Sequence, residues 1–345
     1  MRRNYSYFLS LLPGIVTVFG NLQGGNWVFT NLIFTLGILP VVELFVPQNK
    51  SNEIDEAAFI PDLVLVLQLM MQTIALSSFI YIVKGNSLTG FQLLGAVLST
   101  GIHTGTCGIV VAHEMIHRKN AGWQWGGKYL LFTAANVYFF VEHLRVHHKW
   151  VGTERDPATA RKDESVYAFF LRSVYGQFLG AWKMEADRMK QEGRSVLHPS
   201  NYVFRNIVLQ LAFLAILTFI FGYPVALLFL AQAFVANFLL EYTNYIEHYG
   251  LSRPENVRVQ EDLSWQTDKV VSRILLIELS RHSDHHFYAS KPYHKLESLA
   301  KSPVLPGGYA SAFYMAIIPP LWFKIVNKSL ENYLKANPQN SRIAL

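Results

Sequence analysis

Six stretches of apolar residues, separated by short polar breaks or by long polar segments, dominate the chain. A transmembrane helix needs about 20 mostly apolar residues. The stretches that reach or approach this length are residues 5–20, 27–46, 61–83, 88–112, 203–221 and 223–246. The last two belong to one long apolar run that Phe221-Gly222-Tyr223-Pro224 divides, and glycine close to proline is typical of a turn. The pattern therefore predicts six spanning helices, of which the last two form a hairpin.

Two further stretches resemble membrane segments without meeting the same standard. Ala310–Phe323 is apolar, but it is only about 14 residues long and contains Pro319-Pro320, which favours an interfacial segment over a seventh span. Arg2-Arg3 and the apolar residues after them resemble a signal peptide, but no small-residue cleavage site follows. We therefore expect the first helix to be retained.

The basic residues predict how the chain is oriented. Thirteen Lys and Arg lie between His113 and Tyr202, and eight lie between Glu247 and Ala310, whereas each short break between spans holds at most one. Because cytoplasmic loops carry the excess of Lys and Arg, both long segments and both termini are expected in the cytoplasm. The expected architecture is all-α: one polytopic membrane-bundle domain, residues 1–345, with a histidine-rich cytoplasmic cap at 113–202 and 247–345.

Composition agrees with a membrane protein and excludes several other classes. Hydrophobic residues make up 51% of the chain and charged residues only 16%, whereas soluble domains carry about 25% charge. The single cysteine, Cys107, excludes an internal disulfide and any zinc or iron–sulfur site built from cysteines. The net charge of +6 is first an orientation signal, and no nucleic-acid partner is expected.

Histidine is concentrated in four short boxes. The chain has 12 histidines. Nine lie in the boxes: His113, His117, His143, His147, His148, His248, His282, His285 and His286. Spacings of three and four residues place side chains on one face of a helix, so each box that holds more than one histidine can present them together. His103 lies inside the fourth span, on a different helix face from the first box, and is not counted, and His198 and His294 are expected at the surface.

Nine imidazoles exceed what one metal ion can hold, whereas two ions with four or five ligands each would use them all. Imidazole suits zinc, copper, iron and nickel. A closed structural zinc site usually has four ligands, so nine favour a pair of redox ions, with iron first. The spacing alone leaves copper and zinc open.

Acidic residues beside the boxes are expected to support such ions. Two divalent ions held by neutral imidazoles leave about four positive charges, which nearby carboxylates can offset while they accept hydrogen bonds from the outward ring N–H groups. The candidates are Glu114, Glu142, Asp156, Glu247 and Asp284. Glu241 and Glu278 are further candidates.

The boxes resemble those of a known family. His113-Glu114-Met115-Ile116-His117, Glu142-His143-Leu144-Arg145-Val146-His147-His148, Asn244-Tyr245-Ile246-Glu247-His248-Tyr249-Gly250 and Arg281-His282-Ser283-Asp284-His285-His286 are similar to the boxes of membrane alkane 1-monooxygenases. That family belongs to the membrane fatty acid desaturase and hydroxylase superfamily. The resemblance includes Asp156-Pro157-Ala158 and Pro306-Gly307-Gly308-Tyr309-Ala310-Ser311, and the third box discriminates most. Arg118, Val146 and Phe287 depart from the family pattern without touching a histidine.

The resemblance implies a six-span bundle and a non-haem site of two iron ions (Fe2+/Fe3+) held by the nine histidines. It implies hydroxylation of the terminal methyl group of medium-chain n-alkanes to primary alcohols with O2. The implied electron source is NAD(P)H, through a reductase and a rubredoxin or ferredoxin-like carrier. The implied location is the bacterial inner membrane, with the metal site on the cytoplasmic side and the apolar substrate entering from the lipid.

Other functions of the same scaffold remain open at this point. Hydroxylation of an alkylaromatic methyl group, or hydroxylation or desaturation of a fatty acyl chain, would use the same boxes. A metal transport or storage protein would place polar groups along the spans, whereas here the histidines gather at one end. Around the second box, Arg145, Lys149 and Arg155 form a basic surface that could dock an acidic electron carrier.

Overall fold

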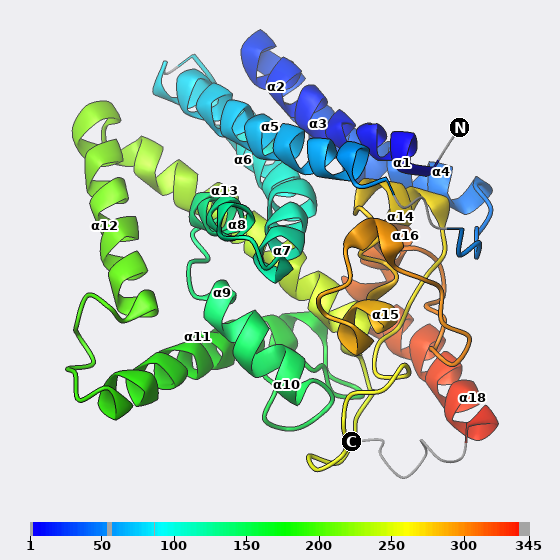
Figure 1. Ribbon diagram of the computed structural model, residues 1–345. Coiled ribbons are helices and arrows are strands. Elements are labelled where there is room, and N and C mark those ends of the chain that lie inside the picture. Colours follow the sequence, from blue (N-terminus) through cyan, green and yellow to red (C-terminus); the bar gives the residue numbers. More distant parts are fainter. Residues whose placement is uncertain (1–2, 54–56, 86, 338–345) are drawn as a thin grey trace. The chain divides into compact units, whose positions relative to one another are not determined.

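The computed structural model describes residues 3–53, 57–85 and 87–337 (Figure 1). Over this part of the chain the secondary structure is helical, and no β-strand is formed beyond two isolated bridges. The predicted all-α class is therefore confirmed. The two ends of the chain lie outside the described residues, and their expected cytoplasmic location stays a prediction.

Six helical segments are long and apolar enough to cross a membrane. They are Arg3–Gln23, Gly25–Phe45, Phe59–Lys84, Gly90–His117, Tyr202–Phe221 and Tyr223–His248. They coincide closely with the six predicted stretches, including the hairpin. Gly222 ends the fifth segment with a φ of 87°, a left-handed conformation that glycine adopts without strain, and Pro224 lies in the first turn of the sixth.

Several spans are continuous paths made from shorter helical pieces. The first and second contain α1 (Arg3–Ser6), η1 (Tyr7–Leu11), α2 (Leu12–Gln23), η2 (Gly25–Phe29), α3 (Thr30–Leu32), η3 (Ile33–Ile38) and α4 (Leu39–Phe45). The third is α5 (Phe59–Lys84), and the fourth joins α6 (Gly90–His103), η4 (Thr104–Ile109) and α7 (Val110–His117). The hairpin is α12 (Tyr202–Phe221) and α13 (Tyr223–His248). The pieces η3 and η4 are π-helical turns, which widen a helix locally.

The remaining helices lie outside the spans. Between the fourth and fifth spans are α8 (Ala121–Thr133), α9 (Phe139–Glu142), η5 (His143–His147), α10 (His148–Trp150) and α11 (Val166–Gln191). After the sixth span come α14 (Val270–Leu275), α15 (His282–Phe287), η6 (Tyr293–Lys295), α16 (Tyr309–Ala316), α17 (Pro319–Trp322), η7 (Phe323–Asn327) and α18 (Lys328–Ala336). The chain bends by 119° between α16 and the helices after Pro319. This sharp bend is expected at Pro319-Pro320, because proline cannot continue the preceding helix.

Residue contacts divide the chain into two compact units. The first, called here the span unit, contains Met1–Ile38, Ala57–Val141 and Leu179–Leu240. The second, called the histidine unit, contains Leu39–Glu56, Glu142–Phe178 and Glu241–Leu345. The arrangement as a single domain stays a prediction, and each unit is described by itself.

Buried polar side chains bond between helices inside the span unit. The amide of Gln72 on α5 donates to the hydroxyls of Thr104 and Thr133, at 3.0 and 3.1 Å. Thr104 in turn donates to Gln232 on α13 at 2.9 Å. In a membrane protein such side chains either bond between helices or line a polar cavity. Here they bond between helices.

Two glycines bring the fourth and sixth spans together in the same unit. A Cβ atom on Gly101 would lie 2.7 Å from the backbone oxygen of Gln232, and one on Gly105 would lie 3.1 Å from that of Ala236. Small residues four apart allow such close approach of two membrane helices. These glycines therefore serve helix packing.

Candidate metal centre

Four histidines of the histidine unit form one buried group. His147, His248, His282 and His286 each offer a ring nitrogen, and these nitrogens all lie within 4.8 Å of one another. The Nε2 atom of His286 lies 2.9 Å from Nε2 of His282 and 3.2 Å from Nε2 of His147. We call these residues the four-histidine group. They come from three separate boxes: the second, third and fourth.

Three more histidines of this unit form a second group. The Nε2 atom of His148 lies 3.0 Å from Nε2 of His143 and 3.2 Å from Nε2 of His285. We call these residues the three-histidine group. The seven box histidines of the histidine unit are thus divided four to three, and the second and fourth boxes each contribute to both groups.

A π-helical turn produces the division within the second box. We expected His143 and His147 to share a face, because four residues make about one turn of an α-helix. Their rings do lie side by side, with centroids 5.2 Å apart. The segment His143–His147 is π-helical, however, and His143 also meets His148, five residues on. Because a π-turn closes between residues five apart, it brings these two rings together, while the Nε2 atom of His147 lies beside His286 of the other group. The spacing thus pairs the two rings as predicted, and the structure divides their nitrogens between the two groups.

The histidines of the first box belong to the span unit. His113 and His117 lie one turn apart on α7, and their ring centroids are 5.0 Å apart. His113 is 8% exposed. The spacing of four residues thus pairs the two rings on one helix face, as the sequence predicts.

The fixed hydrogen bonds of the rings test whether the four-histidine group suits a metal ion. His147 Nδ1 lies 3.0 Å from Oδ2 of Asp156, and His248 Nδ1 lies 3.2 Å from the backbone oxygen of Leu263. A carbonyl oxygen or an ionised carboxylate only accepts hydrogen bonds, so both Nδ1 atoms carry the proton and both Nε2 atoms present a lone pair. Lone pairs that face one another require a cation or an additional proton between them, and this donor set therefore fits a metal ion.

The spacing of the nitrogens agrees with shared coordination. Two nitrogens that bind one ion at about 2.1 Å and at right angles lie about 3 Å apart. The neighbouring Nε2 atoms in both groups are 2.9–3.2 Å apart. Burial lowers the pKa of His286 well below its usual value, and the neighbouring rings of His282 and His148 lower it further. A ligand histidine must be neutral, so this environment favours metal binding.

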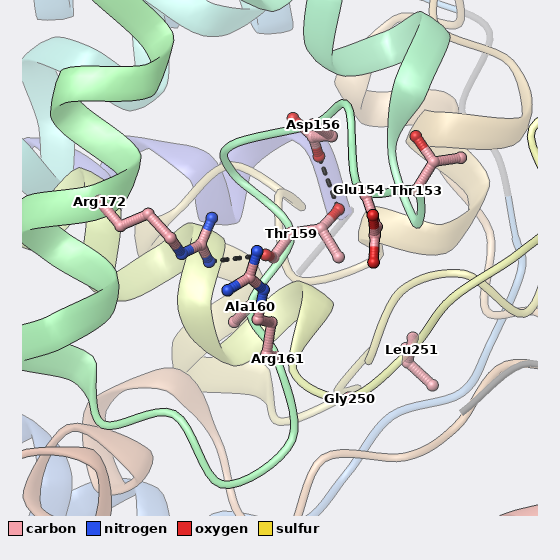
Figure 2. A pocket seen from close by; sticks show the side chains of 9 residues that line it. All are labelled: Thr153, Glu154, Asp156, Thr159, Ala160, Arg161, Arg172, Gly250 and Leu251. Atoms are coloured by element: carbon pink, nitrogen blue, oxygen red, sulfur yellow. Dashed lines mark hydrogen bonds between the residues drawn. The ribbon is translucent and has the colours of Figure 1, made fainter. Parts of the chain in front are cut away.

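Asp156 is held in a tight loop beside Thr159 (Figure 2), and its carboxylate contacts His147. Thr159 donates its hydroxyl to Oδ2 of Asp156 at 2.7 Å, and the backbone N–H of Ala158 donates to Oδ1 at 3.1 Å. Burial acts to raise the pKa of Asp156, but His147 and Thr159 outweigh it and lower the pKa. The pocket drawn in Figure 2 is beside this loop and has a volume of about 10 Å³, which is room for about one water molecule.

Two more predicted acids are buried in the histidine unit. Glu247 Oε2 lies 3.1 Å from Nε2 of His282, and its side chain is 1% exposed. Glu142 is also 1% exposed. Burial, followed by the charges of Asp156 and Glu241, raises the pKa of Glu142 well above its usual value. These carboxylates would be stabilised in their charged form by cations among the histidines.

The other predicted acids have different partners. Glu114 accepts a hydrogen bond of 2.6 Å from Arg118. Asp284 accepts from Lys291 Nζ at 2.7 Å and from the backbone N–H of Glu297 at 2.8 Å. Glu278, a further candidate, pairs with Arg273. A role for Glu114 or Asp284 beside a ring nitrogen stays a prediction.

The structure also adds two residues that the sequence did not assign to the site. Tyr309 donates its hydroxyl to Oε1 of Glu247 at 2.7 Å, and the backbone oxygen of Leu263 accepts from His248. Tyr309 lies in the segment Pro306–Ser311 that the family resemblance includes, but its contact with Glu247 is visible only in the fold. Leu263 carries no sequence signal, because a backbone oxygen has no residue preference. His198 is exposed as predicted, but the surface prediction for His294 was wrong, since it is 1% exposed. The turn η6 folds His294 inward together with buried Tyr293.

The three candidate docking residues are accessible. Arg145, Lys149 and Arg155 are all exposed. Lys149 and Arg155 lie over the ring of Trp150, at 4.8 and 4.5 Å from its centroid, and Arg155 pairs with Glu255. Their exposure is compatible with docking, which stays a prediction.

Comparison with known proteins places these boxes in a family. The family model described as fatty acid desaturase matches residues 89–315, which include all nine box histidines. Alkane 1-monooxygenase 1 of Pseudomonas aeruginosa is 34% identical over 96% of this chain and 92% of its own length. The chain belongs to the alkane 1-monooxygenase family, within the desaturase superfamily. It is an integral membrane protein.

Other relatives support the same family and show its breadth. Alkane 1-monooxygenase 2 of Alcanivorax borkumensis is 32% identical over 96% of this chain and 92% of its own length. The xylene/toluene monooxygenase hydroxylase component XylM of Pseudomonas putida is 25% identical over 93% of this chain and 87% of its own length. The alkane 1-monooxygenases are thus more similar to this chain than the xylene/toluene enzyme is.

Proposed function

We propose that this protein hydroxylates the terminal methyl group of medium-chain n-alkanes, using O2 and two iron ions. The observation that carries the proposal is the division of the buried histidines into groups of inward-facing ring nitrogens. Family membership supplies the reaction class, since the curated relatives are named alkane 1-monooxygenases. The greater similarity to these relatives than to the xylene/toluene enzyme favours an alkane over an alkylaromatic substrate.

The nine box histidines would hold the two ions. One ion would bind the four-histidine group, and the three-histidine group would hold the other. A ligand role for His113 and His117 is supported by the family assignment and by their pairing on one face of α7. The family assignment and the need for a redox-active metal favour iron over zinc or copper.

Bound iron would activate O2 for removal of a hydrogen atom from a strong C–H bond, a reaction that no side chain can perform alone. The protein's residues would orient and neutralise the centre. Asp156 and the Leu263 backbone oxygen hold the Nδ1 protons of His147 and His248, which keeps each Nε2 lone pair directed inward. Glu247 would supply negative charge beside His282.

The setting of the reaction follows from the same family. The apolar substrate would enter from the lipid and present one end to the metals. Electrons would come from NAD(P)H through a reductase and a rubredoxin or ferredoxin-like carrier that docks at the exposed basic residues around Trp150. We place the protein in the bacterial inner membrane with the histidines on the cytoplasmic side, because the long segments that carry them hold most of the basic residues.

The decisive experiment combines product analysis with metal analysis of the purified full-length protein. With NADH and a rubredoxin chain, we expect octane to give 1-octanol and the protein to contain two irons per chain. His286→Ala should abolish turnover and lower the iron content, whereas His198→Ala, at an exposed histidine outside the boxes, should change neither. A protein without transition metal, or one that oxidises only xylene or only a fatty acyl chain, would contradict the proposal.

A further inference from the structure

A buried chain of hydrogen bonds in the histidine unit links the end of the second span to the four-histidine group. It begins at Glu43 on α4 and passes through the turn at the start of α16, where Gly308 caps the helix and Tyr309 is its first residue. It ends at Glu247 and His282. In this unit α14 and α16 pack against α4 (Figure 1). The mechanism above does not use Glu43 or Tyr309.

Glu43 anchors the turn. Its carboxylate is 0% exposed and accepts hydrogen bonds from the hydroxyl of Ser272 and from the backbone N–H and hydroxyl of Ser311, the last two at 2.9 and 3.0 Å. A Cβ atom on Gly308 would overlap this carboxylate, so the turn needs glycine there. Three hydrogen bonds to a buried carboxylate hold the turn firmly, because hydrogen bonds to a charged group are stronger than those between neutral groups.

This turn fixes the position of Tyr309. Its backbone N–H donates to Ser272 at 2.8 Å, and its backbone oxygen accepts from the hydroxyl of Tyr242 at 2.5 Å. With its backbone held on both sides, the side chain reaches Glu247, where its hydroxyl donates to Oε1 at 2.7 Å. The other oxygen of Glu247 lies 3.1 Å from His282 Nε2. Tyr309 is 4% exposed, so water does not replace this hydrogen bond readily.

We infer that Tyr309 is a positioning residue that holds the Glu247 carboxylate at the four-histidine group, and that Glu43 fixes the turn carrying it. The inference rests on the proposed metal site. The hydrogen bond from Tyr309 occupies Oε1 and leaves Oε2 as the oxygen that faces His282 and any ion bound there. Without the hydroxyl, the carboxylate can rotate, and the ion loses a negative charge at a defined distance.

The test measures how firmly the full-length, iron-loaded protein holds its metal. We expect Tyr309→Phe to weaken retention of one of the two irons about tenfold in chelator competition, the scale seen when a group that supports a metal ligand is removed. It should also alter the Mössbauer signal of one iron only. Tyr245→Phe is the matched control: its hydroxyl is in the same unit and is buried, but it donates to the backbone oxygen of Glu164, and iron retention should stay within about twofold.

A double variant tests whether Tyr309 acts through Glu247. In a Glu247→Ala background, Tyr309→Phe should cause no further loss of iron, because the group that it positions is gone. Unchanged retention in Tyr309→Phe, or an equal loss in the Glu247→Ala background, would overturn the inference. If Tyr309→Phe does not fold, Glu43→Gln replaces it: it must weaken the same iron, and wild-type retention would overturn the inference.

These outcomes separate the inference from the proposed function. Wild-type protein that holds two irons, together with a Tyr309→Phe variant that holds them equally well, removes the role of Tyr309 and leaves the di-iron proposal standing. Wild-type protein that holds a different metal contradicts the di-iron proposal, while the same variants still test Tyr309 with that metal. Wild-type protein that binds no metal contradicts both.

Discussion

At the scale of single residues, the acceptors behind the rings decide which nitrogen faces inward. Asp156 and Leu263 bind the Nδ1 atoms of two histidines from different boxes. Acids adjacent to a box histidine do not all behave alike: Glu247 lies against His282, whereas Asp284 bonds to Lys291. Adjacency in sequence therefore indicates which carboxylates are near the histidines, but not which one contacts a ring.

The contact of Asp156 with His147 leads to a test by substitution. Asp156→Asn keeps the size of the side chain but removes the charge that holds the Nδ1 proton of His147. We expect iron at the four-histidine group to bind at least about tenfold more weakly in chelator competition. Glu331→Gln, at an exposed acid paired with Lys162, is the control and should leave binding unchanged. Equal iron affinity in Asp156→Asn and wild type would show that the carboxylate does not support the ligand.

At the scale of elements, local features of the helices determine which histidine rings meet and how closely two spans pack. The π-turn η5 brings His143 to His148, five residues on, within one short box. In the span unit, Gly101 and Gly105 allow α6 and η4 to contact the backbone of α13. The apolar length of each span is visible in the sequence, whereas these local contacts depend on which helices become neighbours.

The packing at Gly101 can be tested by stability. In Gly101→Ala the added carbon would lie 2.6 Å from Cβ of Val235 and 2.7 Å from the Gln232 backbone oxygen, so one helix must move. Overpacking of this kind costs about 1–3 kcal/mol of unfolding free energy. We expect the unfolding temperature of the detergent-solubilised protein to fall by several degrees. Gly90→Ala is the control, since nothing lies within 4 Å of its added carbon, and an equal fall in both variants would contradict the packing argument.

At the scale of the whole molecule, the apolar surface and the basic charge have different roles. The six spans carry the apolar surface that holds the protein in the bilayer. The segments between and after them carry most of the 30 Lys and Arg residues, and the net charge is +6. A basic surface of this kind attracts an acidic partner over a distance that salt shortens to about 8 Å at physiological ionic strength.

The docking hypothesis therefore predicts a salt effect. Turnover driven by a rubredoxin should fall steeply as salt is added, whereas reduction of the same protein by dithionite should change little. Arg155→Glu should lower the rubredoxin-driven rate several-fold at low salt and flatten its salt dependence. Arg194→Glu, at an exposed arginine paired with Glu192, is the control. A flat response to salt in the wild-type protein would argue against docking at this surface.

Apolar length and residue identity are properties of short segments, so the six spans, the nine box histidines and the family can be predicted before any contact is known. The sequence also indicates the carboxylates near the histidines. The division of the seven box histidines of one unit, the pairing of each carboxylate with a ring and the contacts of Glu43 and Tyr309 become visible in the fold alone. Such contacts join residues far apart in the chain: Glu43 bonds to Ser311 across 268 residues, and this bond forms after the helices have packed.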